Sequence, residues 1–530
     1  MSEKRDLTLD RDEESLRRRD PSKAHKIDSA LVKAIVGLLL IAIGAILVWL
    51  PPSEKAVGAG SSRFGDWSAN LLSNSTPVPA KRNVILMVSD GMGPTSLSLT
   101  RSFRQYVDKL PYNDILNLDK HFIGHSRTRS TSSLITDSAA GATAFSCAKK
   151  SYNGAIAVLD DDSACGTVLE GAKLNGYLTG LVVRTSITDA TPAAFAAHAQ
   201  DRSMQDLIAE HELGIGHPLG RSVDLLMGGG LCHFLPNSHK QGCRHDDRDL
   251  VQYAKENGWR VAMALEELKQ EREHHGANQT LPALALFAPT DMPWEIDHSA
   301  PSLADMTQEA LALMGSASDE TDQSFFMLIE GSRIDHAGHS NDPSSQVREV
   351  LAYDEAFKIA VEFAKSRGDT VVISTSDHET GGLTAGRQTT KEYPEYVWYP
   401  EVLANVDHST HYLANELAVR ASQDKKDVEE FIEQVLEPSL GFDLNKHEKK
   451  RIKKHAHSAQ DVLADIVSTH AHVGWTTHGH TAVDVNVYAY GADELRGSNE
   501  NTDIGKFLVD YLGVDLEFVT EKISGIRNKQ

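Results

Sequence analysis

The chain has 530 residues, of which 40% are hydrophobic and 24% are charged, and its formal net charge at pH 7 is −22. This acidic balance argues against binding of nucleic acids or of anionic membrane surfaces by the soluble part of the protein. The length would allow several domains, but the spread of the motifs described below favours one large α/β domain with insertions.

The N-terminal segment contains an apolar run over residues 34–50 that extends back to residue 30 across Lys33. A run of this length is just sufficient to span a bilayer. Basic residues cluster before the run and few follow it closely, so the positive-inside rule predicts a cytosolic head and a lumenal or extracellular remainder. A cleavable signal with a cleavage site near Val57 is the alternative, but the long head favours an uncleaved type II anchor.

These features divide the N-terminal part into a cytosolic tail (1–29), a transmembrane anchor (30–50) and a stalk rich in Ser, Gly and Pro (51–82). From Asn83 onward, strand-like apolar runs alternate with helical stretches, and clear runs occupy residues 179–183, 225–227, 325–330, 370–376 and 485–490. This alternation predicts an α/β fold with a central, largely parallel sheet sandwiched by helices. A charged helical stretch over residues 385–471 interrupts it, so we expect the α/β domain to consist of residues 83–384 and 472–530.

The segment over residues 135–143 is the most informative part of the chain. Asp137 precedes Ser138, and the small residues that follow suit the first turn of a helix. A serine there would present its hydroxyl where free N–H groups and the helix dipole favour a bound anion such as phosphate. Serine is a poor nucleophile without a base or a metal, and the chain has no G-x-S-x-G elbow. The segment therefore favours a serine activated by metals.

Side chains that suit metals occur in four further blocks. Three of the blocks place a carboxylate at the carboxyl end of an apolar run, where open α/β sheets gather their ligands. Singly, each residue is compatible with an ordinary turn or surface position. Together they predict a metal site for serine chemistry on phosphate esters. The residues are Asp90, Glu330, Asp335, His336, His339, Asp377, His378 and His480.

In their residues and order these blocks resemble the alkaline phosphatases, from about residue 84 to residue 491. The resemblance is carried by the Asp-Ser-Ala-Ala-Gly run at Asp137, by residues 189–193, by residues 330–339 and by the Asp-His-Glu run at Asp377. The N-terminal layout is similar to the membrane-anchored vacuolar branch of fungi. The resemblance implies hydrolysis of a broad range of phosphate monoesters through a phosphoserine at Ser138, in a homodimer on the vacuole membrane. It also implies that the insertion forms a crown near the dimer interface.

The resemblance further implies two zinc ions and one magnesium ion per subunit. The ligand sets are Asp335, His339 and His480 for one zinc, Asp90, Asp377, His378 and Ser138 for the other, and Asp90, Thr191, Glu330 and a water held by Asp189 for magnesium. His480 is preferred to His478 because of the Thr-Ala-Val-Asp-Val run that follows it. Imidazole and carboxylate suit zinc, whereas carboxylate, hydroxyl and water suit magnesium.

Three further residues are expected beside these ligands. Arg202 lies thirteen residues after Asp189, the spacing of the family arginine that binds two phosphate oxygens, a geometry that a guanidinium matches. Asp137 and His336 are expected to support the phosphate site. His336 is of the animal type and Asp189 of the bacterial type, so the chain combines features of both branches.

The cysteines and glycosylation motifs agree with a lumenal domain. Four cysteines allow three pairings, and the local pairs Cys147–Cys165 and Cys232–Cys243 are favoured. Asn74 and Asn278 lie in N-x-S/T acceptor motifs.

Two alternatives differ from the phosphatase hypothesis. One is a sulfatase or phosphodiesterase of the same superfamily, but Ser138 has no C/S-x-P-x-R setting, and a phosphodiesterase more often uses threonine and lacks the arginine at Arg202. The other is an inactive, membrane-tethered binding protein, against which the intact serine and ligand set argue.

Overall fold

The computed structural model describes residues 81–423 and 425–526. The predicted cytosolic tail and transmembrane anchor, nearly all of the stalk, and Asn74 lie outside these residues. Within the described residues, no helix combines the length and the apolar character that crossing a bilayer requires.

The described strands form one large sheet and one short ribbon. The strands are β1 (Asn83–Val88), β2 (Phe122–Arg127), β3 (Leu178–Ser186), β4 (Leu225–Gly229), β5 (Arg260–Ala262), β6 (Ala283–Leu286), β7 (Phe325–Glu330), β8 (Thr370–Thr375), β9 (Glu379–Thr380), β10 (His480–Thr481), β11 (Val485–Tyr490) and β12 (Gly497–Glu500). The ten-stranded sheet has the order β12-β2-β11-β8-β1-β7-β3-β4-β6-β5. Within this ten-stranded sheet of described strands, only β11 is antiparallel to its neighbours, β2 and β8, so the expected largely parallel sheet is confirmed.

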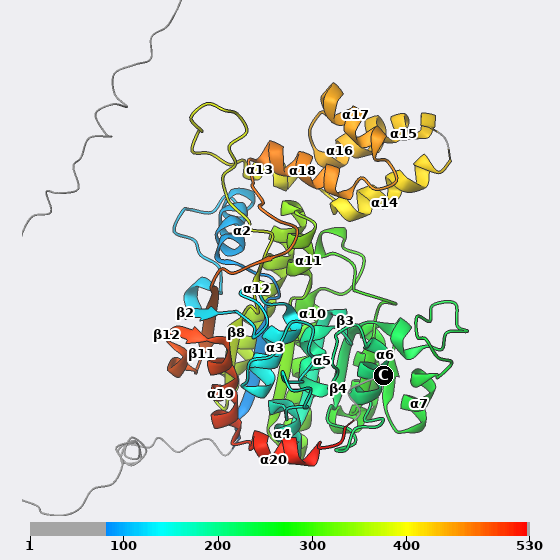
Figure 1. Ribbon diagram of the computed structural model, residues 1–530, viewed down its shortest axis with the longest axis vertical. Coiled ribbons are helices and arrows are strands. Elements are labelled where there is room, and N and C mark those ends of the chain that lie inside the picture. The colour runs from blue at the N-terminus through cyan, green and yellow to red at the C-terminus, as the bar shows by residue number, and fades with distance from the viewer. Residues whose placement is uncertain (1–80, 424, 527–530) are drawn as a thin grey trace, which may run out of the picture. The chain divides into compact units, whose positions relative to one another are not determined.

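Helices connect the strands and cover both faces of the sheet (Figure 1). The α-helices are α2 (Pro94–Val107), α3 (Ser138–Cys147), α4 (Val168–Leu174), α5 (Ala190–Ala196), α6 (Gln205–Glu212), α7 (Leu250–Glu256), α8 (Leu265–His275), α9 (Ala277–Thr280), α10 (Leu303–Thr321), α11 (Arg333–His339), α12 (Pro343–Arg367), α13 (Pro400–Asn405), α14 (Thr410–Ala421), α15 (Lys425–Phe431), α16 (Glu437–Leu440), α17 (Lys446–Lys454), α18 (Gln460–Ala471), α19 (Asn501–Leu512) and α20 (Leu516–Lys522). Shorter helical turns are η1 (Asp119–His121), η2 (Leu231–Phe234), η3 (Glu295–Asp297), the π-helical η4 (Ile432–Leu436) and η5 (Asp493–Leu495).

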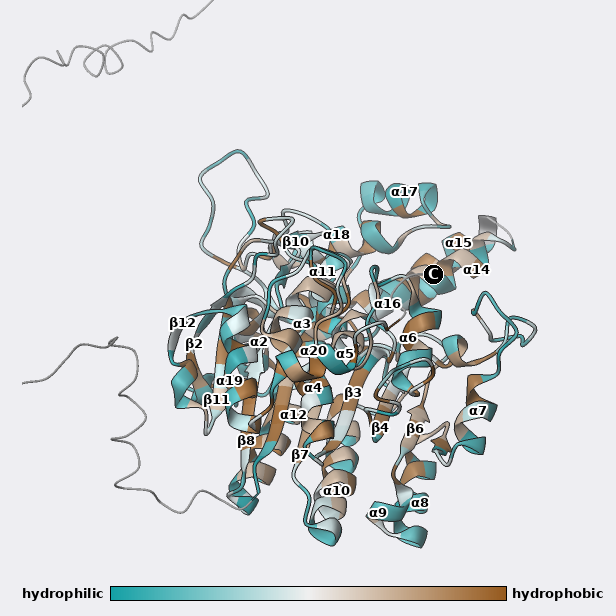
Figure 2. Ribbon diagram, turned by 60° about the horizontal axis from the view of Figure 1, so that its bottom comes forward, coloured by the Kyte–Doolittle hydropathy of each residue, from teal (hydrophilic) through white to brown (hydrophobic). Residues whose placement is uncertain are grey.

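The central strand β1 shows why the sheet needs helices on both sides. Val84 and Leu86 pack into an apolar cluster with α3, α4 and α19, whereas Ile85 and Met87 point to the opposite face and pack with α10 and α12. An uninterrupted apolar run is typical of a parallel strand that is buried on both faces. Figure 2 shows the same arrangement, with hydrophobic strands in the middle and hydrophilic residues on the outer helices.

The predicted strands agree with the structure most closely where the apolar runs are long. Residues 325–330 and 485–490 are strands with the expected bounds, and the predicted runs at 179–183, 225–227 and 370–376 correspond to β3, β4 and β8 with shifted ends. The strands β2, β5, β6 and β12 are not among the predicted runs. β2, which lies next to the edge strand β12, alternates exposed or half-buried residues with buried ones, and β5 has only three residues, so neither has a long apolar run.

Residues 400–471 form the helices α13 to α18, which appear together beyond the sheet in Figure 1. Their apolar residues, including Leu413, Leu436 and Leu463, share one buried cluster with Leu99 and Phe103 of α2. The basic segment that begins at residue 446 forms α17. The boundaries of this insertion and its role as a crown remain predictions.

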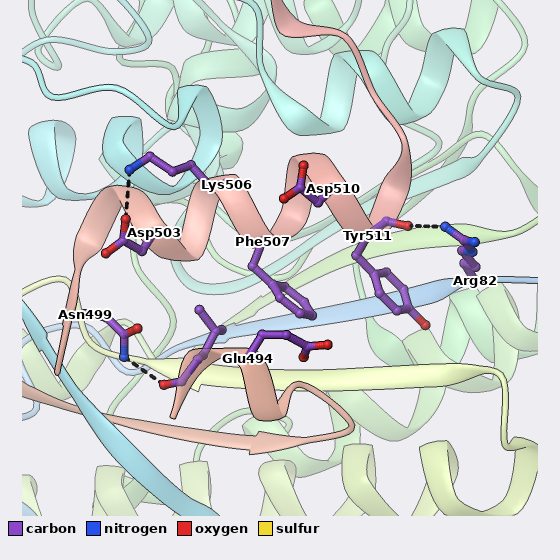
Figure 3. Close-up of a pocket in the computed structure, with 9 residues that line it drawn as sticks. Arg82, Glu494, Asn499, Asp503, Lys506, Phe507, Asp510 and Tyr511 are labelled. Carbon is purple, nitrogen blue, oxygen red and sulfur yellow. Dashed lines mark hydrogen bonds and ion pairs between the residues drawn. The ribbon is translucent and has the colours of Figure 1, made fainter. Parts of the chain in front are cut away.

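A cavity of about 660 Å³ lies at α19, η5 and β12, and Figure 3 shows its lining. Lys506 and Asp503 form an ion pair at one side of it, and the carbonyl oxygen of Tyr511 accepts a hydrogen bond from Arg82. The lining residues are Arg82, Glu494, Leu495, Asn499, Asp503, Lys506, Phe507, Asp510 and Tyr511, and they include none of the predicted metal ligands.

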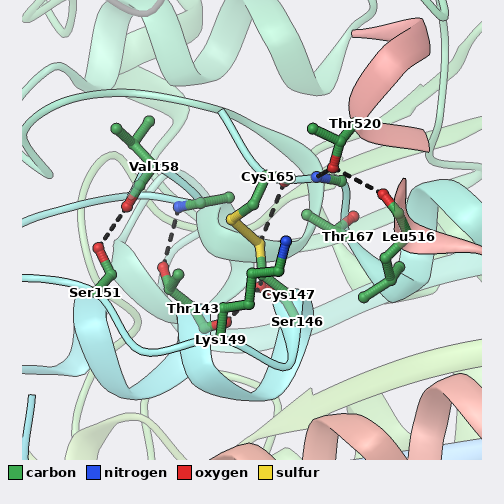
Figure 4. Close-up of a disulfide and its surroundings, with 12 residues drawn as sticks. Thr143, Ser146, Cys147, Lys149, Ser151, Val158, Cys165, Thr167, Leu516 and Thr520 are labelled. Carbon is green, nitrogen blue, oxygen red and sulfur yellow. Dashed lines mark hydrogen bonds between the residues drawn. A yellow bond between two sulfur atoms is a disulfide. The ribbon is translucent and has the colours of Figure 1, made fainter. Parts of the chain in front are cut away.

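The two disulfides join the local pairs that the sequence favours. Cys147, the last residue of α3, is bonded to Cys165, and Cys232 is bonded to Cys243. The first bond connects the end of the helix that begins at Ser138 to the segment before α4 (Figure 4). Both cysteines of this bond are buried. Asn278, the described glycosylation candidate, is exposed on α9, and its modification remains a prediction.

Candidate metal centre and active site

Ser138 is the first residue of α3, as the Asp-Ser run predicts. Asp137 caps the helix, because its Oδ1 accepts a hydrogen bond from the backbone N–H of Ala140 at 3.0 Å. The small residues have a packing reason, since a Cβ on Gly141 would lie 2.9 Å from the Cβ of Asp377. The absence of a side chain at Gly141 therefore lets the first turn of α3 approach the end of β8.

Three neighbouring parallel strands bring the first carboxylates together. β1 pairs with β7 and β8, so that Val88 lies opposite both Glu330 and Thr375. Asp90 follows β1 and Asp377 follows β8, which places both next to Glu330 at the carboxyl ends of these strands. Open α/β sheets bind their ligands at the carboxyl ends of their strands.

The first ligand cluster consists of Asp90, Asp377 and His378, whose ligand atoms lie within 4.8 Å of one another. The Nε2 atom of His378 is 3.2 Å from Asp377 Oδ2, 3.5 Å from Asp90 Oδ1 and 3.1 Å from the hydroxyl oxygen of Ser138. All four side chains are buried. The structure thus brings together the four residues predicted to bind one zinc ion, although their binding of zinc stays a prediction.

The second ligand cluster consists of Asp335, His339 and His480. Nε2 of His339 lies 3.2 Å from Asp335 Oδ2 and 3.2 Å from Nε2 of His480. Two imidazole nitrogens at this separation cannot both carry a proton that points at the other. His478 directs its Nδ1 to the carbonyl oxygen of His339 at 2.8 Å, so His480 is the histidine that faces the carboxylate.

The buried carboxylates around the two ligand clusters are not fully compensated by positive charge from the protein. Burial, with the neighbouring Asp377 and Asp335 carboxylates, raises the pKa of Asp90 well above its ordinary value, and burial raises the pKa of Glu330 to about 8. The buried oxygens Asp90 Oδ1 and Asp377 Oδ2 share one imidazole nitrogen, Nε2 of His378, which lies 3.5 Å from the first and 3.2 Å from the second. Buried carboxylates that are only partly paired are costly unless cations compensate them. The donor set of carboxylate, hydroxyl and imidazole therefore fits bound metal ions.

The residues predicted for magnesium lie at the same end of the sheet. Thr191 is buried in α5, and Asp189 caps this helix by accepting a hydrogen bond from Ala190 N–H at 2.7 Å. Glu330 accepts a hydrogen bond from the hydroxyl of Ser332 at 2.6 Å. Glu330 and Asp189 both contribute to the raised pKa of Asp90, which is the residue shared between the magnesium set and a zinc set.

Arg202 is held beside the start of α3 by two carboxylates. Its guanidinium donates to Asp189 Oδ1 at 3.0 Å and to Asp137 Oδ2 at 3.4 Å. Burial disfavours its charge, but these carboxylates outweigh burial and raise the pKa of Arg202 above its ordinary value. One third of the side chain remains exposed, so the cation is fixed in place and still accessible to an anion.

His336 contacts residues that are not among the predicted site residues. Arg333 donates to Nδ1 of His336 at 3.0 Å and to Asp291 at 2.9 Å, and its guanidinium stacks 3.8 Å above the ring of Trp294. Burial and the charge of Arg333 lower the pKa of His336. Arg333 lies inside the 330–339 block, but no pattern in the sequence connects it to Asp291 and Trp294.

A further buried cluster, Glu170, His198 and His217, lies apart from the predicted ligands. His198 faces the carbonyl oxygen of Ala157 with Nδ1 at 3.0 Å and Glu170 Oε1 with Nε2 at 2.9 Å, so both of its ring nitrogens donate. Nε2 of His217 lies 2.8 Å from the same carboxylate oxygen, and its Nδ1 accepts from Leu219 N–H. This proton arrangement describes a buried ion pair, in which the imidazoles compensate the charge of Glu170.

Comparisons with known proteins agree with these observations. The alkaline phosphatase family model matches residues 81–514. The chain is 52% identical to the repressible alkaline phosphatase of Saccharomyces cerevisiae over 472 residues, which cover 84% of this chain and 83% of the yeast protein.

Two solved structures are similar to the fold. A cold-active alkaline phosphatase from Shewanella sp. is 31% identical, with a TM-score of 0.69 over 81% of this chain and 99% of that one. A magnesium-bound variant of the alkaline phosphatase from the Antarctic bacterium TAB5 is 28% identical, with a TM-score of 0.58 over 82% and 99% of the two chains. With the family match over most of its length and the yeast relative at this identity, the chain belongs to the alkaline phosphatase family.

Proposed function

We propose that this protein is a zinc- and magnesium-dependent alkaline phosphatase that hydrolyses a broad range of phosphate monoesters to an alcohol and inorganic phosphate. The observation that carries the proposal is the position of Ser138. Its hydroxyl lies at the start of α3, 3.1 Å from His378 and beside the unbalanced group of buried carboxylates. Support also comes from the family membership and from the magnesium described for the TAB5 variant.

The proposed ligand sets are those expected from the sequence. The zinc ligands are Asp335, His339 and His480 at one site and Asp90, Asp377, His378 and Ser138 at the other, and the magnesium ligands are Asp90, Thr191 and Glu330 with Asp189 acting through water. When bound, the metal ions would lower the pKa of the serine hydroxyl and of water and would neutralise charge on the oxygens of the phosphate.

The protein's own groups supply position and charge. Asp137 fixes the first turn of α3 by accepting from Ala140 N–H, and a helix N-terminus favours a bound anion. The Ser138 oxygen attacks phosphorus, the bond to the alcohol oxygen breaks, and water then hydrolyses the phosphoserine to release inorganic phosphate. Arg202 binds the non-reacting phosphate oxygens, which keeps the phosphoryl group oriented in both steps. The proposed roles of these groups involve the phosphate and not the alcohol, which supports a broad specificity.

The remaining parts of the proposal rest on the sequence and the resemblance. We propose a homodimer with the helices of residues 385–471 as its crown, and a type II anchor over residues 30–50 that holds the domain on the lumenal side of the vacuole membrane. The apolar run and the basic residues before it support the anchor.

The decisive experiment is hydrolysis of a chromogenic phosphate monoester by metal-loaded wild type and by Ser138→Ala. We expect turnover to fall on the order of a thousandfold or more in Ser138→Ala while the metal content is retained. Ser146→Ala is the matched control, because Ser146 lies on the same helix and its hydroxyl bonds only within the helix end. Unchanged turnover in Ser138→Ala, or activity on diesters or sulfate esters alone, would contradict the proposal.

A further inference from the structure

The hydroxyl group of Thr380 lies between the two ligand clusters. It donates a hydrogen bond to Asp335 Oδ1, and Nδ1 of His378 lies 3.1 Å from its oxygen. Asp335 belongs to one cluster and His378 to the other. Thr380 is fully buried, so no solvent competes for either hydrogen bond.

The directions of both hydrogen bonds follow from the number of protons. An ionised carboxylate only accepts hydrogen bonds, so the single hydroxyl hydrogen of Thr380 points to Asp335. The hydroxyl oxygen must then accept from the Nδ1–H of His378. In the neutral imidazole this leaves the lone pair on Nε2, the nitrogen that faces Asp377, Asp90 and Ser138. The Thr380 hydroxyl therefore selects the tautomer of His378 that can bind a cation.

The backbone of Thr380 is fixed by the segments that carry the other ligands. Its N–H donates to the carbonyl oxygen of Gly91, the residue after Asp90, at 3.1 Å. In the ribbon of β9 and β10, Thr380 is the direct partner of His480. These contacts leave the hydroxyl little freedom to move away from the two side chains that it joins.

We propose that Thr380 is a positioning residue that couples the two metal sites. Its hydroxyl orients His378 in one site and Asp335 in the other, so loss of the hydroxyl weakens both sites at once. This inference rests on the proposed function to the extent that both clusters bind zinc. Hydrogen-bond partners of metal ligands typically change metal affinity by about 10- to 100-fold when they are removed.

The test compares Thr380→Val, which replaces the hydroxyl by a methyl group, with Thr380→Ser, which keeps it. Zinc affinity is measured by competition with a chromogenic chelator, and zinc content by elemental analysis. We expect about 10- to 100-fold weaker zinc binding in Thr380→Val and nearly wild-type binding in Thr380→Ser. Thr384→Val is the matched control, because the Thr384 hydroxyl bonds to the carbonyl oxygen of Gly386 away from both clusters. Thermal unfolding of the metal-free proteins separates a loss of affinity from a loss of folding.

Two further variants, used as backgrounds for Thr380→Val, test the coupling between the two zinc sites. His378→Gln leaves only the Asp335 cluster intact, and His339→Gln leaves only the His378 cluster intact. Thr380→Val should weaken the remaining zinc site in both backgrounds. Wild-type affinity in Thr380→Val, or an equal loss in Thr380→Ser, would overturn the inference while leaving the phosphatase proposal untouched. A wild-type protein that binds no zinc and hydrolyses no ester would overturn both.

Discussion

Two buried groups of acids and histidines in this protein differ in how their charges are compensated. In the cluster of Glu170, His198 and His217, one carboxylate faces two imidazoles, and every ring nitrogen has a protein group beside it. At the carboxyl end of the sheet, Asp90 and Glu330 have raised pKa values, and buried oxygens of Asp90 and Asp377 share one imidazole nitrogen, Nε2 of His378.

The difference shows that residue type alone does not identify a metal site. Both groups contain carboxylates and histidines within ligand distance of one another. The Glu170 cluster is satisfied by its own protons, so it needs no cation. The carboxylates at the sheet end repel one another, so that region needs positive charge from outside the chain.

Removal of metal is expected to cause the largest loss of stability. The loss should come from the carboxylates at the end of the sheet and not from the Glu170 cluster. Stripping zinc with a chelator should lower the free energy of unfolding by about 4 kcal/mol per site when free zinc had exceeded its Kd a thousandfold. Denaturant unfolding of loaded and stripped protein measures this difference. The Glu170→Gln variant should lose the same free energy of unfolding as wild type when the metal is stripped. A smaller loss in that variant would mean that the Glu170 cluster also binds metal.

Glu170→Gln should itself destabilise the protein by about 3 to 5 kcal/mol, because it leaves the buried His198 without its counter-ion. Glutamine keeps an oxygen that can accept from the N–H of Thr167, so the cap of α4 is preserved. The measurement is denaturant unfolding of metal-free protein. In the double variant with His198→Gln the loss should be smaller than the sum of the two single losses, and simple additivity would argue against an ion pair.

The contribution of this ion pair should depend on pH in a defined direction. Burial opposes the charge of His198, but Glu170 outweighs it and raises the pKa of His198 above its ordinary value of 6.5. The pKa of Glu170 is below its ordinary value of 4.5, because His198 and His217 outweigh the effect of burial. The histidine contribution is therefore complete below pH 6.5 and lost as the pH rises through the folded pKa, and the glutamate contribution is present above pH 4.5.

Wild type and His198→Gln, both metal-free, should thus differ most between about pH 4.5 and 6.5 and converge at alkaline pH, by about 1.4 kcal/mol for each unit of pKa shift. Denaturant unfolding across pH 5 to 9 measures the difference in free energy of unfolding between the two proteins. A difference that stays constant over this range would show that the cluster is not charged in the folded protein.

Glu212 provides a third case, a buried acid with neither a cation nor a hydrogen-bond partner among the residues that the structure describes. Burial raises its pKa well above the ordinary value of 4.5, so the folded state binds a proton that the unfolded state releases at neutral pH. Glu212→Met should therefore stabilise the protein by about 1 kcal/mol or more, with a gain that increases above pH 4.5. Chemical unfolding at pH 5 and pH 8 tests this, and a destabilised variant would reveal a role for the carboxyl group.

Much of the fold could be predicted because its signals are local. β1, β7 and β8 are long apolar runs that end on acidic residues, and such runs identify buried parallel strands without any knowledge of their neighbours. β2 could not be identified in this way, because its buried residues alternate with more exposed ones and its partners β11 and β12 are distant in the sequence.

The residues of the candidate site also differ in whether a local sequence signal identifies them. Most of the candidate side chains could be found from local pattern, from Ser138 after its capping Asp137 to the acids and histidines of the later blocks, since each lies at the end of a recognisable element. Their partners could not be found in that way: the folded structure shows that Thr380 joins the two clusters, that Arg333 contacts His336 and that Glu170 has imidazole partners. The physical reason is that proton positions and charge balance depend on distances between segments that are remote in the chain, and local periodicity contains no information about those distances.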